Sequence, residues 1–150
     1  RPDGWTSADA AGLPILPGLL RWNEVQADQV DHAIRFTTDV TSRHHLWPAR
    51  HDAGSQSSLA YPPMGARFRL SASFSTSGYS AYAVTVIEAM KTYGLVLADN
   101  GSPWYFQGDQ DAHWPAHLIE ELGTIPASAF VAVDTSSLKV SDDSGQVATR

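Results

Sequence analysis

A short segment rich in imidazole and guanidinium groups has the clearest potential for chemistry in this sequence. Residues 43–51 read RHHLWPARH and combine three histidines, two arginines and one tryptophan. Arg50 can hold an anionic group through two parallel hydrogen bonds, and His51 can transfer a proton near neutral pH. Trp47 offers a ring for stacking, and Arg43 adds a second cation. We predict a catalytic or binding loop; the alternative is that Trp47 anchors the loop and the charges pair with neighbouring groups.

A second group of candidate residues follows an apolar stretch in the second half of the chain. Asp99, Asn100 and Gly101 form the kind of sequence that favours a tight hairpin turn, and Trp104 and Tyr105 come directly after it. We predict that Asp99 is a catalytic carboxylate, that Asn100 orients a substrate, and that the two aromatic rings stack on it. Asp-Asn-Gly is also ordinary turn chemistry, so a purely structural role remains the alternative.

Neither group of histidines has the spacing of an established metal site. His113 and His117 are four residues apart, but Glu does not follow His113 and a helix is expected to begin only at Pro115. His44 and His45 are adjacent, so in an extended chain they point to opposite faces. The sequence also lacks a Gly-x-Ser-x-Gly elbow and a phosphate-binding glycine loop. We predict no metal and no cofactor.

The composition excludes several classes of protein. The formal net charge is −6, and only 10 residues are Lys or Arg, which argues against nucleic acid as the main partner. The chain has no cysteine, so disulfides and thiolate chemistry are absent. No apolar run approaches the roughly 20 residues that a membrane-spanning helix needs. The sequence therefore predicts a soluble globular protein with no membrane partner.

Hydrophobic periodicity predicts an α+β fold that is mainly β with two helices. The expected sheet is antiparallel or a β-sandwich, and an alternative is that it forms part of a larger domain. Ile34 and Phe36 are expected to face inward. We predict strands at 32–38, 66–74, 95–98, from 104 onward and at 129–133, a short turn at 24–26, helices at 80–93 and 115–122, and a loop at 52–63.

The 150 residues are enough for one domain with a single core. Residues 1–20 contain three prolines and three glycines among apolar side chains, so we predict an extended apolar segment. A second chain, or an upstream segment removed by processing, would cover it. Residues 140–150 are polar and are predicted to fray. Residues 1–150 are thus a single domain or the carboxyl-terminal part of a larger one.

Four segments carry a resemblance to known sequences. They are RPDGWTSADAAGLP at 1–14, WPARH at 47–51, PPMG at 62–65 and ADNGS at 98–102. Together they resemble a group of functionally uncharacterised secreted proteins of soil bacteria and fungi, over most of the chain. The resemblance implies an extracellular setting and additional residues before Arg1. It assigns no activity and no catalytic residue.

These observations lead to a ranked set of functional hypotheses. The first is a secreted glycan-active enzyme domain, a hydrolase or a lyase, acting on a polysaccharide or oligosaccharide. Asp39 and Asp52 are further carboxylates that a glycosidase pair could use. The alternatives are a non-catalytic carbohydrate-binding module and a structural fragment of a larger assembly. Each hypothesis that involves a carbohydrate ligand requires the loop at 43–51 and the turn at 99–101 to meet in one cleft.

Overall fold

A computed structural model describes residues 3–142 and 144–149, and it contains one mixed sheet of five strands. Residues 1, 2, 143 and 150, which belong to the predicted apolar segment and tail, lie outside the described residues. The central pair of strands is parallel and the other three pairings are antiparallel. Across the sheet the strands are β4 (Tyr105–Phe106), β1 (Ile34–Thr38), β3 (Leu95–Asn100), β2 (Arg67–Leu70) and β5 (Phe130–Val133).

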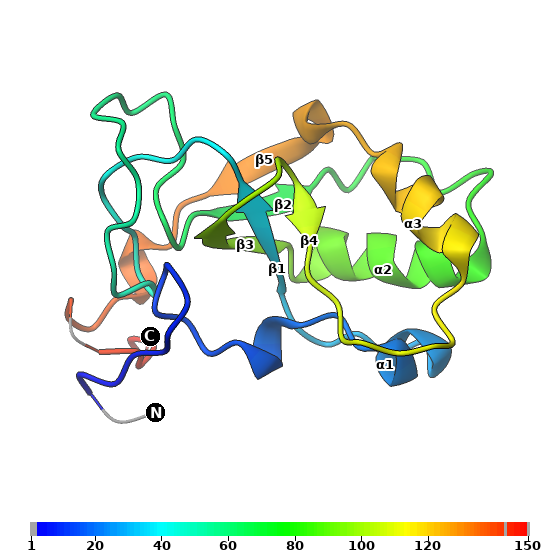
Figure 1. Cartoon of the computed structure of the whole chain (residues 1–150), viewed down its shortest axis with the longest axis horizontal. Coiled ribbons are helices and arrows are strands. Elements are labelled where there is room, and N and C mark those ends of the chain that lie inside the picture. Colours follow the sequence, from blue (N-terminus) through cyan, green and yellow to red (C-terminus); the bar gives the residue numbers. More distant parts are fainter. Residues whose placement is uncertain (1–2, 143, 150) are drawn as a thin grey trace.

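The α+β class is confirmed, whereas the expected antiparallel sheet or sandwich is not what the chain forms. β1 and β3 run parallel, and the single sheet curls instead of packing on a second one (Figure 1). The predicted hairpin after Asn100 is also wrong, because β1 lies between β3 and β4. Alternating hydrophobicity determines which face of a strand is buried; it does not determine which strand lies beside it or in which direction.

In the part of the chain that the structure describes, three α-helices and three short 3-10 turns accompany the sheet. The helices are α1 (Trp22–Gln26), α2 (Ala81–Thr92) and α3 (Ala116–Gly123), and the turns span Leu16–Gly18, Ala127–Ala129 and Ser136–Leu138. The hydroxyl of Ser80 accepts a hydrogen bond from the backbone N–H of Ala83 and caps α2. Glu121 of α3 accepts bonds from the N–H and the hydroxyl of Ser80, which joins the two predicted helices. In the described ranges, no helix is long and apolar enough to span a bilayer.

The helices cover one face of the sheet and irregular chain covers the other. Ile34 and Phe36 of β1 are completely buried in the core, as predicted, and the ring of Phe36 contacts Phe68 and Trp104. The remaining residues of β1 are buried as well, so its outer face is also covered. Residues 3–20 and 40–66 provide this cover, and residues 3–15 and 40–66 lie on the side of the molecule away from α2 and α3 (Figure 1).

A buried ion pair attaches the amino-terminal segment to the centre of the sheet. Nη2 of Arg35, on the outer face of β1, lies 3.0 Å from Oδ2 of Asp9, and the two side chains are only 4% and 2% exposed. Oδ1 of Asp9 accepts hydrogen bonds from the N–H of Leu13 and the hydroxyl of Ser7. The sequence pattern places Arg35 on the solvent side of a strand, and the segment that buries it contains no helix or strand except one 3-10 turn.

Candidate functional site

The loop at 43–51 lies between the two ends of the described chain. The N–H of Arg50 donates to the carbonyl of Ala11 at 2.7 Å, and its Nη1 donates to the carbonyl of Asp142 at 3.2 Å. The indole N–H of Trp47 donates to the carbonyl of Ser144 at 3.0 Å. Two of the predicted ligand-binding side chains are therefore engaged in holding segments of this protein together.

The imidazole of His51 is also engaged within the chain. Its Nε2 lies 2.8 Å from the hydroxyl of Thr6, and its Nδ1 lies 3.3 Å from the carbonyl oxygen of Asp9. A histidine that acts as a general acid or base needs one nitrogen within reach of the substrate. His51 could offer a ring nitrogen to a substrate only after breaking one of these two contacts. The side chains of Arg43 and His44, in contrast, are exposed.

Asn100 of the acidic turn bonds to residues on either side of the loop at 43–51. Its Oδ1 accepts a hydrogen bond from the hydroxyl of Thr41, and its Nδ2 donates to the carbonyl of Ala53. Asp99 accepts a bond from the N–H of Asn100, and within the described chain no hydrogen bond links Asp99 to His51. Asn100 is thus positioned to join β3 to residues 41–53.

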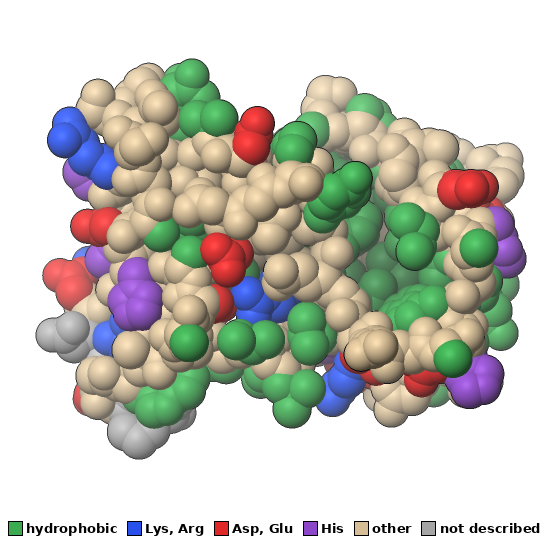
Figure 2. Space-filling model, viewed as in Figure 1, with side chains coloured by type: hydrophobic (Ala, Val, Ile, Leu, Met, Phe, Trp, Pro, Cys, Tyr) green, Lys and Arg blue, Asp and Glu red, His purple; other side chains and the backbone are tan. Residues whose placement is uncertain are grey.

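Trp104 and Tyr105 lie elsewhere, beside an apolar cavity of about 410 Å³ between β4, α3 and β5. Figure 2 shows this hollow open to solvent and lined by hydrophobic side chains, on the opposite side of the view from the loop at 40–66. Its walls include the rings and aliphatic chains of Trp104, Phe106, Trp114, Leu118, Leu122 and Phe130. The structure therefore divides the predicted site residues between two regions.

Trp104 forms one end of the cavity in a strained backbone conformation. Its φ angle is +58°, which is rare for a residue other than glycine, and its N–H donates to the carbonyl of Thr37. The indole stacks on Phe36 at 4.7 Å between ring centroids and contacts Phe68 and Phe130 at 5.2 and 5.5 Å. These contacts hold the ring against residues of β1, β2 and β5.

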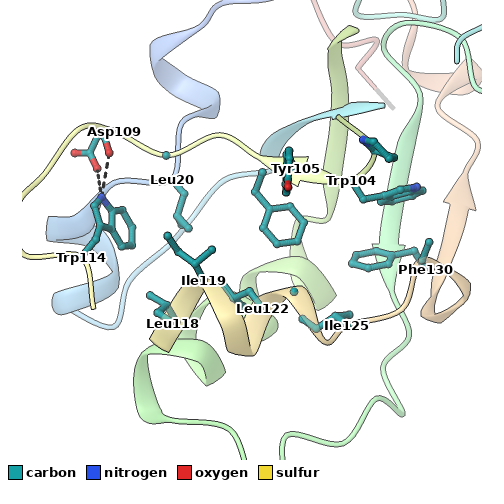
Figure 3. Close-up of a pocket in the computed structure, with 15 residues that line it drawn as sticks. Leu20, Trp104, Tyr105, Asp109, Trp114, Leu118, Ile119, Leu122, Ile125 and Phe130 are labelled. Carbon is teal, nitrogen blue, oxygen red and sulfur yellow. Dashed lines mark hydrogen bonds between the residues drawn. The ribbon is translucent and has the colours of Figure 1, made fainter. Parts of the chain in front are cut away.

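Trp114 forms the other end of the cavity and is fixed by Asp109. The indole N–H of Trp114 donates to the carbonyl and to Oδ1 of Asp109, as the dashed lines in Figure 3 show. Oδ1 also accepts from the N–H of Trp22. Asp109 is the one charged side chain among the described residues that line the cavity, and it is engaged in positioning the wall.

The α3 side of the cavity was not anticipated from the sequence. Leu118 and Leu122 are buried, but Ile119 is 70% exposed at the rim. A helix that only covers a sheet needs a single apolar stripe, and Leu118, Ile119 and Leu122 form a wider one. This extra apolar surface is the feature of the sequence from which the cavity could have been predicted.

A smaller hollow of about 150 Å³ lies between Trp47 and the carboxyl-terminal segment. Its lining includes His45 and Asp142, and His45 Nδ1 lies 2.6 Å from Oδ1 of Asp52. The hydrogen bond from Lys139 holds the pKa of the Asp142 carboxyl below its usual value. Within residues 3–142 and 144–149, no three His, Cys, Asp or Glu side chains gather in a way that could hold a metal ion.

A wide, shallow groove of about 610 Å³ follows α1 and has a more polar lining. It includes Arg21, Asn23, Glu24, Gln29 and His32. Glu24 is largely buried and forms ion pairs with Arg21 and with His32 Nε2, the latter at 3.2 Å. Burial raises the pKa of the Glu24 carboxyl, but the hydrogen bonds from Arg21 and His32 outweigh it and lower the pKa below 4.5.

This shift predicts a loss of stability in acid. A carboxyl group whose pKa is lowered by folding stabilises the protein above its unfolded pKa and ceases to do so as the pH falls through the folded value. Glu24→Gln should therefore lower the free energy of unfolding by about 0.5–1 kcal/mol at pH 7, and the difference from wild type should shrink below pH 4.5. Urea unfolding of both proteins at pH 7 and pH 3.5 measures this difference in stability. Glu120→Gln, at an exposed position of α3, is the control, and an equal effect of both variants at both pH values would contradict the prediction.

Comparisons of the chain with models of protein families, with curated proteins and with solved structures find no match.

Proposed function

We propose that this protein is a non-catalytic binding domain whose cavity receives an apolar, ring-sized group of a ligand. The supporting observation is the hollow of about 410 Å³ between Trp104 and Trp114 (Figure 3). Ligand sites typically occupy about 300–1,000 Å³ and are lined mostly by apolar and aromatic side chains. This cavity is near the lower end of that range, which suits a bicyclic ring such as an indole.

The chemistry of the wall favours an apolar ring over a sugar. Each buried hydroxyl without a hydrogen-bond partner costs about 1–3 kcal/mol, and a sugar ring carries several. Asp109 is held by Trp114 and Trp22, and the Tyr105 side chain is largely exposed. A sugar in the cavity would therefore lose more hydrogen bonds to water than the wall could replace.

Carbohydrate binding is the second candidate, and the groove along α1 favours it. Asn23 and Gln29 are exposed there beside charged groups, so hydroxyls could form hydrogen bonds without becoming fully buried. The glycan-cleaving hypothesis, hydrolase or lyase, has less support because His51 is engaged by Thr6 and by the Asp9 carbonyl. Secretion remains a prediction from the resemblance.

The test is an NMR titration of the ¹⁵N-labelled protein with indole and, separately, with methyl glucoside. Indole should shift the amide signals of residues around Trp104 and α3. Ile119→Asp, which places a charge at the rim, should weaken indole binding about tenfold or more because a carboxylate keeps the mouth hydrated. Leu59→Asp is the matched control, since Leu59 is 90% exposed in the distant loop.

The two candidates give different results in this titration. Shifts caused by methyl glucoside near Asn23 and Gln29, with no response to indole, would favour carbohydrate binding. Equal indole affinity in wild type and Ile119→Asp would contradict the proposal that the cavity is the site.

A further inference from the structure

An unpaired sheet edge lies beside the apolar cavity. β5 is the last strand of the sheet, and no described segment pairs with its outer edge. Phe130, its first residue, also lines the cavity. The cavity wall and the free edge are therefore parts of the same strand.

The strand register shows which backbone groups of β5 face outward. The N–H of Ser71 donates to the carbonyl of Ala129, so alternation in an antiparallel pair makes Arg69 and Val131 the next hydrogen-bonded pair. Ala132, opposite Phe68, then directs its N–H and C=O away from β2. The other side of β2 agrees with this assignment, since the bond from the N–H of Leu97 to the carbonyl of Ala66 places the backbone groups of Phe68 toward β3.

β5 is short, but its outer edge carries no charge, proline or bulge that would block strand addition. Edge strands are usually protected by lysine, proline, a bulge or an inward-pointing charge. β5 reads Phe-Val-Ala-Val, its pairing with β2 has no register shift, and Val131 is 57% exposed. A second extended chain could therefore pair with Ala132 without displacing any charged side chain of β5.

We infer that the partner is an extended peptide that adds to β5 as a further strand and inserts one apolar side chain into the cavity. This inference rests on the proposed function, because the inserted side chain is the ring-sized group. In such strand addition, main-chain hydrogen bonds provide affinity and a pocket beside the edge selects the side chain. Phe130 and Ala132 lie on the same face of β5, so a side chain of the added strand on that face points toward the cavity.

Charge complementarity defines the peptide further. The described lining of the cavity holds one charged side chain, the carboxylate of Asp109, and the whole chain carries a net charge of −6. Lysine or arginine beside the inserted ring is therefore favoured over aspartate or glutamate. The expected partner is a basic segment with a central tryptophan or phenylalanine.

The experiment measures fluorescence polarisation of a labelled pentapeptide, Lys-Val-Trp-Val-Lys with blocked ends. Ala132→Pro removes the outward N–H and leaves the bonds to β2, because proline is tolerated on a strand edge that faces solvent. It should weaken peptide binding about tenfold, while the affinity for free indole stays unchanged. Ala132→Ser, which keeps the N–H, is the matched control.

A second measurement keeps the test valid if Ala132→Pro does not fold. The same peptide with an N-methyl group on every residue cannot donate main-chain hydrogen bonds to β5 in either strand orientation, and it should bind wild-type protein about tenfold more weakly than the parent peptide. Equal binding of the two peptides, with indole binding intact, would overturn the strand-addition inference and leave the proposed function standing. Failure of both peptides and of indole would overturn both. Equal binding of a peptide with Glu in place of Lys would overturn the inferred charge preference.

Discussion

Asp9→Asn is expected to lower the free energy of unfolding by about 3–5 kcal/mol, since removing one member of a buried ion pair leaves the other charge without compensation. Asparagine keeps the Oδ1 acceptor that the N–H of Leu13 and the hydroxyl of Ser7 use. The decrease in the free energy of unfolding therefore measures the ion pair with Arg35 and not the hydrogen bonds of the local turn. Urea unfolding followed by tryptophan fluorescence measures it.

A double-mutant cycle separates the interaction energy of the ion pair from the effect of changing each side chain alone. Arg35→Met alone should also be strongly destabilising, while the double variant Asp9→Asn with Arg35→Met should recover most of the loss, because no unpaired charge remains. Asp99→Asn is the control for a carboxylate that is less buried. Additive losses in the double variant would show that the two side chains act independently and would contradict the prediction.

Trp104→Ala is expected to destabilise the fold by about 3–5 kcal/mol, the usual range for deleting a large aromatic side chain from a packed site. The indole contacts the rings of Phe36, Phe68 and Phe130, and all three contacts would be lost. The same variant should bind indole more weakly, because Trp104 forms one end of the cavity. Chemical unfolding and the NMR titration measure the two effects.

Trp104→Gly isolates the strain in the backbone. Both variants lose the ring, but glycine adopts the φ of +58° without the cost of about 1–2 kcal/mol that a β-carbon brings. Trp104→Gly should therefore be more stable than Trp104→Ala, although glycine is normally the more destabilising substitution. The opposite order would show that the backbone at this position is not strained.

Local patterns predicted the elements better than their arrangement. The helix at 80–93 and the strands near 34–38 and 95–98 follow from periodicity and from capping residues such as Ser80. The strand predicted at 66–74 ends at Leu70, because the N–H of Phe74 bonds back to the carbonyl of Ser71 in a turn. The alternation of apolar residues continues through that turn, so it could not indicate where the strand stops.

The candidate site was predicted only in part, for a physical reason. Trp104 and Tyr105 were selected as aromatic residues near a turn, and they do border a cavity. The other wall comes from α3 and from Trp114, and only the curl of the sheet brings these segments together (Figure 3). Arg50 and His51 were selected for their chemical versatility, and that versatility also suits their side chains to hold Asp142, Thr6 and Asp9 by hydrogen bonds.

The loop at 40–66 keeps its path mainly through backbone contacts. Ser42, Arg43 and Leu46 donate their N–H groups to the carbonyls of residues 62, 56 and 64. Side chains at exposed positions such as Arg43 and His44 can therefore change without changing the course of the chain. Substitutions could therefore change the chemistry of this surface during evolution while the backbone of the loop keeps its path.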